Sequence, residues 1–283
     1  MPYSYRSLVD ALSSVGIEDA SEEAALLLER FCGDSGAVRA TLYCDRDHVY
    51  ASSKLDAAVS KRLERYPLQY ILGTWDFYGL SFEVGPDCLI PRPDTEILVE
   101  QALRRIPWNA RVVDLCTGSG CIAVSVLKNR PDVTVTALEL YPDTLKLATR
   151  NAEQNGVFHR FIPLRADLLS DGIEELAENA PYDAILSNPP YISTETVKGL
   201  SPEVGYEPNA ALDGGADGLL FYRAILEHYA PMVRPGGVIV LEIGYDQGDD
   251  LRRLAEQHTP HASFELIRDL GGRDRVVVLH IPV

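Results

Sequence analysis

The stretch Asn188-Pro189-Pro190-Tyr191 combines residue types that could hold a planar amino group. It follows a short apolar run, residues 182–186, which is typical of a buried strand. Two prolines in succession cannot extend a central strand, because neither has an N–H to donate. The resulting stiff turn offers Asn188 Oδ1 and the Pro189 carbonyl, and each could accept one hydrogen of an –NH2 group. Asn-Pro-Pro is by itself also an ordinary turn signal, so residues elsewhere must decide between the two interpretations.

A glycine-containing loop at Asp114-Leu115-Cys116-Thr117-Gly118-Ser119-Gly120 joins an earlier apolar strand to a helix start. In open α/β sheets the first strand–helix crossover binds nucleotide-like ligands, and glycine lets the backbone approach such a ligand closely. Ala123 replaces the third glycine of a GxGxxG pattern, which suits a pyrophosphate less well. A ligand with one nucleoside and no phosphate fits better, and this points to S-adenosylmethionine.

Two carboxylates follow the next two apolar strands. Glu139 lies nineteen residues beyond Gly120, where a carboxylate can accept both ribose hydroxyls of a nucleoside. Asp167 follows the third strand and could reach the adenine amino group, with Leu168 against the ring. The alternative for Asp167 is a helix cap.

These residues need elements to position them, and from Trp108 onward strand and helix patterns alternate. We expect strands at residues 111–115, 133–139, 160–164, 182–187, 237–242, 263–269 and 275–281. We expect helices at residues 122–130, 141–155, 172–179, 216–233 and 247–257. The alternation predicts a doubly wound α/β sheet with helices on both faces. Only residues 270–272 separate the last two strands, so these should form an antiparallel hairpin.

The first part of the chain differs, because residues 1–72 have helical spacing of apolar residues. We expect helices at residues 4–15, 21–32 and 53–65, with Ser21 as a helix cap and Gly33 as a stop. Residues 73–90 alternate as a β-hairpin linker, and residues 91–283 form the main domain. In the main domain, Asp94 or Thr95 could cap a helix that runs to about residue 105. The helical domain either only stabilises the chain or docks a protein partner, and we favour docking.

Composition bounds the class of protein. At 283 residues, with 46% hydrophobic and 24% charged residues, the chain is an ordinary soluble protein with material for two domains. It has no signal-peptide pattern and no run of the roughly 18 apolar residues that a membrane span needs. The five cysteines contain no CxxC pair and the six histidines are scattered, which favours a cytoplasmic chain without a metal site.

The charge is strongly acidic and unevenly distributed. The net charge is −16, with 8 basic against 11 acidic side chains in residues 1–74 and 18 against 31 in residues 75–283. A protein with this net negative charge repels the phosphate backbone of a nucleic acid unless its basic residues form a local patch. Nucleic acid is therefore disfavoured as a direct substrate.

Several further stretches resemble one known family. They are Pro67-Leu68-Gln69-Tyr70-Ile71-Leu72-Gly73, Ile90-Pro91-Arg92-Pro93-Asp94-Thr95-Glu96, Tyr206-Glu207-Pro208-Asn209-Ala210-Ala211-Leu212 and Leu241-Glu242-Ile243-Gly244. With the glycine loop and the Asn-Pro-Pro-Tyr turn, they resemble the release-factor glutamine methyltransferases, from about Pro67 to the C-terminus. These enzymes methylate the glutamine of the Gly-Gly-Gln loop in class 1 peptide chain release factors.

The resemblance implies a seven-stranded class I methyltransferase sheet, release factors as partners and a monomeric enzyme. It also implies S-adenosyl-L-methionine as cofactor and S-adenosyl-L-homocysteine as product. The cofactor-binding residues it implies are Cys116, Thr117, Gly118, Ser119, Gly120, Glu139, Leu140, Asp167, Leu168 and Asn188. The catalytic and substrate-binding residues are Asn188, Pro189, Pro190 and Tyr191, and Glu207 joins them in binding the substrate. Arg92 and Glu96 contact the cofactor or serve in capping and ion pairing.

One residue departs from the family pattern. Cys116 stands where the family has the first glycine of its GxGxG loop, so we expect a φ below zero at this position. We expect Cys116 and Cys121 to be small packing residues and not nucleophiles, because methyl transfer needs no covalent enzyme intermediate.

Two alternatives remain. A DNA or RNA amino-group (adenine N6-type) methyltransferase uses a similar turn, but it flips the base and needs a basic groove. The chain offers only the basic cluster Lys61-Arg62-Leu63-Glu64-Arg65. A binding module that keeps the fold without activity would bind the cofactor and transfer nothing.

Overall fold

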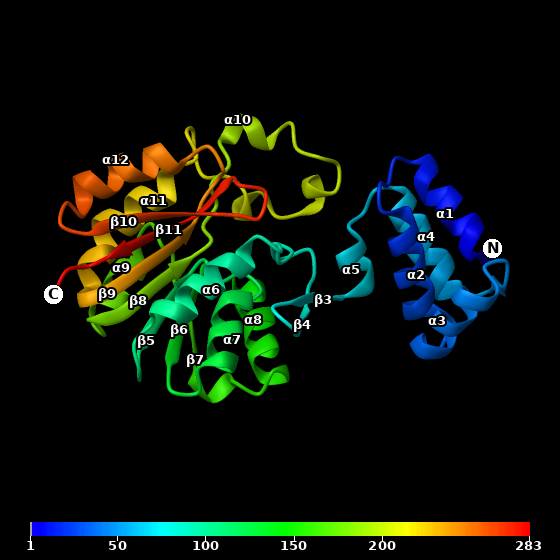
Figure 1. Cartoon of the computed structure of the whole chain (residues 1–283), viewed down its shortest axis with the longest axis horizontal. Coiled ribbons are helices and arrows are strands. Elements are labelled where there is room, and N and C mark those ends of the chain that lie inside the picture. Colours follow the sequence, from blue (N-terminus) through cyan, green and yellow to red (C-terminus); the bar gives the residue numbers. More distant parts are fainter. Residues whose placement is uncertain (1) are drawn as a thin grey trace. The chain divides into compact units, whose positions relative to one another are not determined.

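The computed structural model describes residues 2–283, and the chain forms two compact units (Figure 1). Unit 1 contains residues 2–74 together with Ser201–Tyr206. Unit 2 contains Trp75–Leu200 and Glu207–Val283. Among the described residues, none of the helices has the length and apolar character needed to cross a lipid bilayer.

Unit 1 is mainly helical. Its helices are α1 (Tyr5–Ser14), α2 (Ala20–Phe31), α3 (Ser35–Cys44), α4 (Ser53–Leu63) and α5 (Leu68–Leu72). The strands β1 (Tyr3–Ser4) and β2 (Val49–Tyr50) pair antiparallel. The three helices expected from the sequence are confirmed, whereas α3 and α5 are additional. Ser21 is not the cap of α2, because this helix already begins at Ala20, whose side chain is buried.

The core of unit 1 comes from three helices. Its fully buried leucines and valines include Leu8, Leu12, Leu27, Leu28, Leu55 and Val59, from α1, α2 and α4. Each such side chain contributes about 1.5–3 kcal/mol on burial. In α3 only Val38 is buried, so this helix lacks the apolar stripe that would have marked it in the sequence.

The segment Ser201–Tyr206 belongs to unit 1, although the chain on both sides of it belongs to unit 2. Its Glu203 pairs with Arg62 at 3.2 Å and with Arg65 at 2.6 Å. The Tyr206 ring meets the Tyr66 ring edge-on, with 5.1 Å between the centroids. Ion pairs and ring contacts therefore hold this segment in unit 1.

Unit 2 is built on a seven-stranded sheet, and a separate hairpin precedes it. The hairpin is β3 (Thr74–Phe77) and β4 (Leu80–Glu83). The sheet strands are β5 (Arg111–Leu115), β6 (Thr134–Glu139), β7 (Phe161–Arg165), β8 (Tyr182–Ser187), β9 (Val233–Glu242), β10 (Ser263–Arg268) and β11 (Asp274–His280). Their order is β10-β11-β9-β8-β5-β6-β7. All strand neighbours from β9 to β7 run parallel, and β11 is antiparallel to both β9 and β10. The predicted doubly wound sheet, its strands and the final hairpin are confirmed.

The helices of unit 2 agree with the prediction except that α10 is additional and the region 216–233 is irregular. They are α6 (Thr95–Arg105), α7 (Cys121–Asn129), α8 (Pro142–Gln154), α9 (Asp171–Ala177), α10 (Thr194–Val197), α11 (Leu220–Ala224) and α12 (Gly248–His258). The helix expected over residues 216–233 is confirmed in position, but it begins four residues later and is not a regular α-helix throughout. One continuous helical run consists of α11, a π-helical segment at Ile225–Tyr229 and a 3-10 segment at Ala230–Met232. Gly218 has a φ of +73° and delays the start, and Pro231 lacks the N–H that a continuing helix needs.

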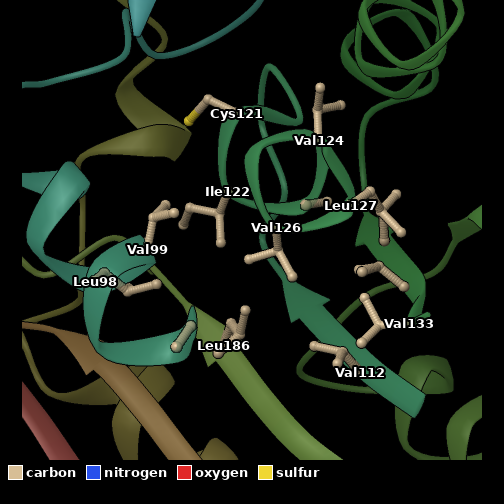
Figure 2. Packing of buried hydrophobic residues seen from close by; sticks show 14 of the residues in the cluster. Leu98, Val99, Val112, Cys121, Ile122, Val124, Val126, Leu127, Val133 and Leu186 are labelled. Carbon is tan, nitrogen blue, oxygen red and sulfur yellow. The ribbon is translucent and has the colours of Figure 1, made fainter. Parts of the chain in front are cut away.

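Helices cover both faces of the sheet, with α6, α7 and α8 on one face and α9, α11 and α12 on the other (Figure 1). Successive strand residues alternate between two cores, so Val112 joins the first and Val113 the second. Figure 2 shows the first core, where side chains of α6 and α7 gather beside Val112 and Leu186. These packed layers fix the carboxyl ends of β5 to β8, where the predicted site residues lie.

Candidate active site

A cavity of about 420 Å³ opens at the carboxyl ends of β5, β6, β7 and β8. Most of the predicted site residues line it: Cys116, Thr117, Gly118 and Ser119 after β5, Glu139 and Leu140 at the end of β6, Asp167 and Leu168 after β7, and Asn188 and Pro190 after β8. Gly120, Pro189, Tyr191 and Glu207 are not among its lining residues. The topology thus brings residues from four separate crossovers to one place.

The glycine loop is shaped by its own hydrogen bonds. The Thr117 N–H donates to the Leu138 carbonyl at 3.0 Å, and the Gly120 N–H donates to the Thr117 carbonyl at 2.8 Å. The Thr117 hydroxyl donates to buried Asp114 at 2.6 Å. Gly120 has a φ of +79°, and a Cβ there would lie 3.2 Å from the Cβ of Ala148. Gly120 therefore permits close packing of the loop against α8 without facing the cavity.

The expected negative φ at Cys116 is wrong, because φ at this residue is +60°. The chain turns back sharply after β5, and Gly118 continues the turn with a φ of +56°. A left-handed conformation costs a residue with a Cβ about 1–2 kcal/mol, which the bonds around the loop offset. Burial raises the pKa of the Cys116 thiol well above its ordinary value. The thiol therefore stays neutral, as a packing residue would.

Glu139 is held by backbone donors on both sides. Its Oε2 accepts from the Gly118 N–H and its Oε1 from the Tyr141 N–H, each at 3.1 Å. Burial raises the pKa of this carboxyl, while these backbone bonds lower it. Each carboxylate oxygen has a second lone pair, so Glu139 can still accept hydrogen bonds from a ligand in the cavity.

Asp167 forms a tight turn before α9. Its Oδ1 accepts from the Leu169 N–H at 2.8 Å, and its own N–H donates to Asp171 at 2.6 Å. The N-cap position of α9 is Ser170, so Asp167 is not the cap of this helix. The adjacent Leu168 is buried, and its carbonyl accepts from the Tyr229 hydroxyl at 2.7 Å. The turn thereby fixes Asp167 and Leu168 at the cavity wall.

The Asn-Pro-Pro-Tyr turn is fixed by tertiary contacts. Asn188 Nδ2 lies 3.2 Å from Thr95 Oγ1, which leaves Oδ1 as the acceptor of this side chain. The Tyr191 hydroxyl donates to Glu242 at 3.3 Å, and the Tyr191 carbonyl accepts from Gln247 at 2.9 Å. A Cβ on Gly214 would lie 2.8 Å from the Pro190 carbonyl oxygen. Backbone packing and side-chain bonds together leave this turn one conformation.

Glu207, Arg92 and Glu96 differ in their relation to the cavity. The Glu207 side chain is buried, accepts from the Ile90 N–H at 3.0 Å and forms an ion pair with Arg92. Arg92 lines the cavity, whereas Glu96 accepts from the Tyr78 N–H of the hairpin turn at 2.7 Å. Glu207 thus holds the segment that carries Arg92.

Sequence reasoning missed part of the lining. Thr95 was considered only as a helix cap, and no role was expected for Cys88, Tyr141 or Phe221, all of which line the cavity. Thr95 lies within a stretch that carries the family resemblance, and this could have marked it as a site residue. The local sequence pattern alone does not distinguish a helix cap from a site residue.

A mostly parallel sheet of this order, with its cavity at the carboxyl ends of the central strands, defines a class I methyltransferase fold. A family model described as Methyltransferase small domain matches residues 93–201, and one described as PrmC N-terminal domain matches residues 5–73. A solved methyltransferase structure from Pyrococcus furiosus is 17% identical and covers 82% of this chain and 100% of that chain, with a TM-score of 0.51. That likeness concerns the fold alone.

Curated relatives identify the family. A release factor glutamine methyltransferase from Geobacter sulfurreducens is 42% identical over 270 residues, which are 94% of this chain and 91% of that protein. One from Cereibacter sphaeroides is 41% identical over 279 residues, which are 98% of this chain and 97% of that protein. The chain belongs to the release factor glutamine methyltransferase family and is a methyltransferase. The resemblance seen in the sequence is confirmed.

Proposed function

We propose that this enzyme transfers a methyl group from S-adenosylmethionine to the side-chain amide nitrogen of the glutamine in the Gly-Gly-Gln loop of class 1 peptide chain release factors. This modification would modulate translation termination. The family membership supports the substrate, since the relatives carry that activity in their names. The observation that carries the proposal is Asn188, whose amide contacts Thr95 through Nδ2 and lines the same cavity as Glu139.

The residues of the cavity fit the proposed cofactor. Glu139 keeps lone pairs for two ribose hydroxyls, and Gly118 lets the backbone come close. Asp167 and Leu168 offer an acceptor and an apolar surface suited to adenine. When bound, S-adenosylmethionine supplies a methyl group that its sulfonium has already activated. The described residues contain no group of three or more metal-binding side chains, and the proposed reaction needs none.

The difficulty lies with the acceptor, because an amide nitrogen delocalises its lone pair into the carbonyl. Breaking this conjugation fully costs on the order of 18–20 kcal/mol. Asn188 Oδ1 and the Pro189 carbonyl accept the two N–H groups and direct the nitrogen lone pair toward the methyl group. These hydrogen bonds strengthen as the nitrogen gains positive charge, which stabilises the transition state. A strong base is unnecessary, since the nitrogen becomes acidic only after it has attacked.

The remaining site residues position the substrate. Tyr191 packs against the glutamine side chain with its ring, which the hydroxyl bond to Glu242 orients. Pro190 stiffens the turn. Glu207 shapes the substrate entrance through its ion pair with Arg92 and its hydrogen bond from the Ile90 N–H. Arg92, as a cavity-lining cation, is the better candidate than Glu96 for a cofactor contact.

The helical domain at residues 1–72 docks the release factor in this proposal. Its support is that the family model of this region is the N-terminal domain of the same family, so the two parts recur together. A cytoplasmic location is supported by the five cysteines, which are all free thiols.

The test is transfer of labelled methyl from S-adenosylmethionine, with a class 1 release factor, DNA or RNA offered separately. Mass spectrometry of the release factor should find one added methyl on the loop glutamine, and a substrate with alanine at that glutamine should gain none. Labelling of nucleic acid instead of the release factor would overturn the proposal in favour of an amino-group methyltransferase acting on bases. Cofactor binding without any transfer would indicate the inactive binding module.

A further inference from the structure

A buried carboxyl lies behind the catalytic turn, and the mechanism above does not use it. Glu242 is the last residue of β9, and 1% of its surface is exposed. Its Oε1 accepts from the Tyr191 hydroxyl at 3.3 Å, while Oε2 is buried without a hydrogen-bond partner. A buried carboxyl with incomplete hydrogen bonding is costly, so its presence beside Tyr191 needs an explanation.

Thr95 stands between this carboxyl and the proposed catalytic amide. It is the first residue of α6, with 2% of its surface exposed, and its Oγ1 lies 3.2 Å from Asn188 Nδ2. Thr95 is also the largest of the influences that lower the pKa of the Glu242 carboxyl, from which we infer that its hydroxyl lies close to this carboxyl. Both proposed catalytic side chains, Asn188 and Tyr191, are therefore linked to Glu242 through one hydroxyl each.

A hydroxyl has one hydrogen to donate, and this makes Thr95 a directional link. If Glu242 is ionised, it can only accept, so the Thr95 hydrogen points to it. Thr95 Oγ1 then accepts from Asn188, which turns Nδ2 toward Thr95 and Oδ1 away from it. If Glu242 is protonated, it can donate to Thr95, and the Thr95 hydrogen becomes available to Asn188 Oδ1. The amide can then flip and present its own –NH2 to an incoming –NH2, where no hydrogen bond forms.

We propose that Glu242 is a positioning residue whose ionised carboxylate fixes the direction of the Thr95 hydroxyl and thereby keeps Asn188 Oδ1 turned toward the methyl acceptor. The inference rests on the proposed function, because it assigns to Asn188 the task of accepting an amide hydrogen. Glu242 itself touches neither substrate nor cofactor in this scheme.

The surroundings of Glu242 place its ionisation near neutral pH. Burial raises the pKa of Glu242 to about 7, against the lowering effects of Thr95, Arg275 and Tyr191. Asp94 raises this pKa, and Arg275 forms an ion pair with Asp94 at 3.2 Å. The titratable and charged groups that interact electrostatically with Glu242 are Asp94, Cys121, Tyr191, Tyr222 and Arg275. Tyr191 has a raised pKa and stays neutral, so among these groups the Glu242 carboxyl is the one expected to change charge near pH 7.

The kinetic test uses Glu242→Gln, Thr95→Val and Thr95→Ser with an intact release factor. Glu242→Gln and Thr95→Val should lower kcat about tenfold or more, as expected when one aligned hydrogen bond is lost from a transition state. The dissociation constant for S-adenosylmethionine should change by no more than about twofold, because these side chains do not bind the cofactor in this proposal. Thr95→Ser keeps the hydroxyl and should recover most of the lost rate. The wild-type kcat should fall as pH drops below about 7, and Glu242→Gln should lose this acidic limb.

Tyr222→Phe is the matched control. The Tyr222 hydroxyl donates to the backbone carbonyl of Glu242 at 2.7 Å, so this variant removes a buried bond at the same residue without touching the carboxyl. It should retain the acidic limb and most of kcat. A wild-type profile in Glu242→Gln, or equal rates in Thr95→Val and Thr95→Ser, would overturn the proposal. So would equal losses of kcat and thermal stability in all four variants, which would indicate a purely structural role.

A measurement without turnover separates this inference from the proposed function. In protein labelled with ¹⁵N-asparagine, the Asn188 side-chain resonances can be assigned by their loss in Asn188→Ala. They should shift with a midpoint near pH 7 in the wild type and stay constant in Glu242→Gln. Absence of this titration overturns the positioning role even if release factor is methylated. Its presence supports the link from Glu242 to Asn188 even if the methyl acceptor proves to be another amide.

Discussion

At the residue scale, the polar groups of the cavity share one arrangement. Each side chain forms some of its hydrogen bonds within the protein. Glu139 accepts from the N–H groups of Gly118 and Tyr141. Asp167 accepts from the Leu169 N–H, and Asn188 contacts Thr95. These internal hydrogen bonds hold each side chain in one orientation with acceptor lone pairs still unused. Little side-chain entropy is therefore lost when a ligand binds. Preorganisation of this kind favours catalysis because the groups need no rearrangement as charge develops.

Replacing Asn188 tests the central acceptor. Asn188→Ala should lower kcat roughly 10²–10³-fold, the range for removal of one preorganised group that stabilises transition-state charge. Calorimetry should find the affinity for S-adenosylmethionine nearly unchanged, since Oδ1 acts on the methyl acceptor. Wild-type turnover in this variant would refute the role assigned to Asn188.

Replacing Glu139 tests the cofactor side of the cavity. Glu139→Gln removes a charged acceptor for hydroxyl groups, and hydrogen bonds to charged groups contribute about 1.5–3 kcal/mol. We expect S-adenosylmethionine to bind roughly 10- to 100-fold more weakly by calorimetry. Glu153→Gln, an exposed glutamate on α8, should bind the cofactor like the wild type. Equal affinity in the Glu139 and Glu153 variants would mean that Glu139 does not contact the ligand.

The sequence predicted residues at strand ends better than residues that reach the site from elsewhere. Glu139, Asp167 and Asn188 were found because the carboxyl ends of parallel strands share one edge. Thr95 was not recognised as a site residue, because 93 positions of the chain separate it from Asn188 and its local pattern is that of a helix start. The φ of Cys116 was predicted wrongly because the shape of the turn outweighs the steric preference of a single Cβ.

At the element scale, strands were predicted more accurately than the loops and short helices around them. All seven sheet strands were located. The parallel strands β5, β6, β8 and β9 are largely buried and leave apolar runs in the sequence. The helix expected over residues 216–233 was located, but its later start at Leu220, after Gly218 with its positive φ, and its π-helical and 3-10 segments were not predicted. The short α3 and α5 bury too few residues to show a helical period.

Gly218 packs directly against the Asn-Pro-Pro-Tyr turn. Its φ is +73°, and a Cβ there would lie 2.4 Å from the Tyr191 carbonyl oxygen and 2.8 Å from Gln247 Nε2. Gly218→Ala must therefore displace the Asn-Pro-Pro-Tyr turn, and we expect the free energy of unfolding to fall by more than about 2 kcal/mol in thermal unfolding. Methyl transfer should fall with it. The control Gly85→Ala has nothing within 4 Å of the added Cβ and should be near neutral. Similar stabilities for the two variants would contradict this account of the turn.

At the scale of the whole molecule, the division of the chain into units does not follow sequence order. The helical character of residues 1–72 was predictable from apolar spacing, but the membership of Ser201–Tyr206 in unit 1 was not. Glu203 lies about 140 positions from the arginines that hold it, and an isolated acidic residue in a loop carries no sign of such a partner. Long-range ion pairs of this kind must be observed in a structure.

The ion pairs of Glu203 predict a pH-dependent stability of unit 1. Partial burial raises the pKa of Glu203, but hydrogen bonds from Arg65 and Arg62 outweigh this and lower it below the ordinary value. A carboxyl whose pKa is lowered on folding stabilises the fold above the unfolded pKa, about 4.3 for glutamate. That contribution is lost as pH falls through the lowered folded value. Glu203→Gln removes it at every pH.

We therefore expect Glu203→Gln to destabilise unit 1 by about 1–2 kcal/mol at pH 7, because Arg65 loses a partly buried partner while Arg62 keeps Glu23. The difference from wild type should shrink as the pH of thermal unfolding is lowered below about 4. Glu195→Gln removes an exposed ion pair with Lys198 and should change stability by less than about 0.5 kcal/mol. A deficit in Glu203→Gln that is constant from pH 7 to pH 3 would show that packing, and not charge, holds this segment in unit 1.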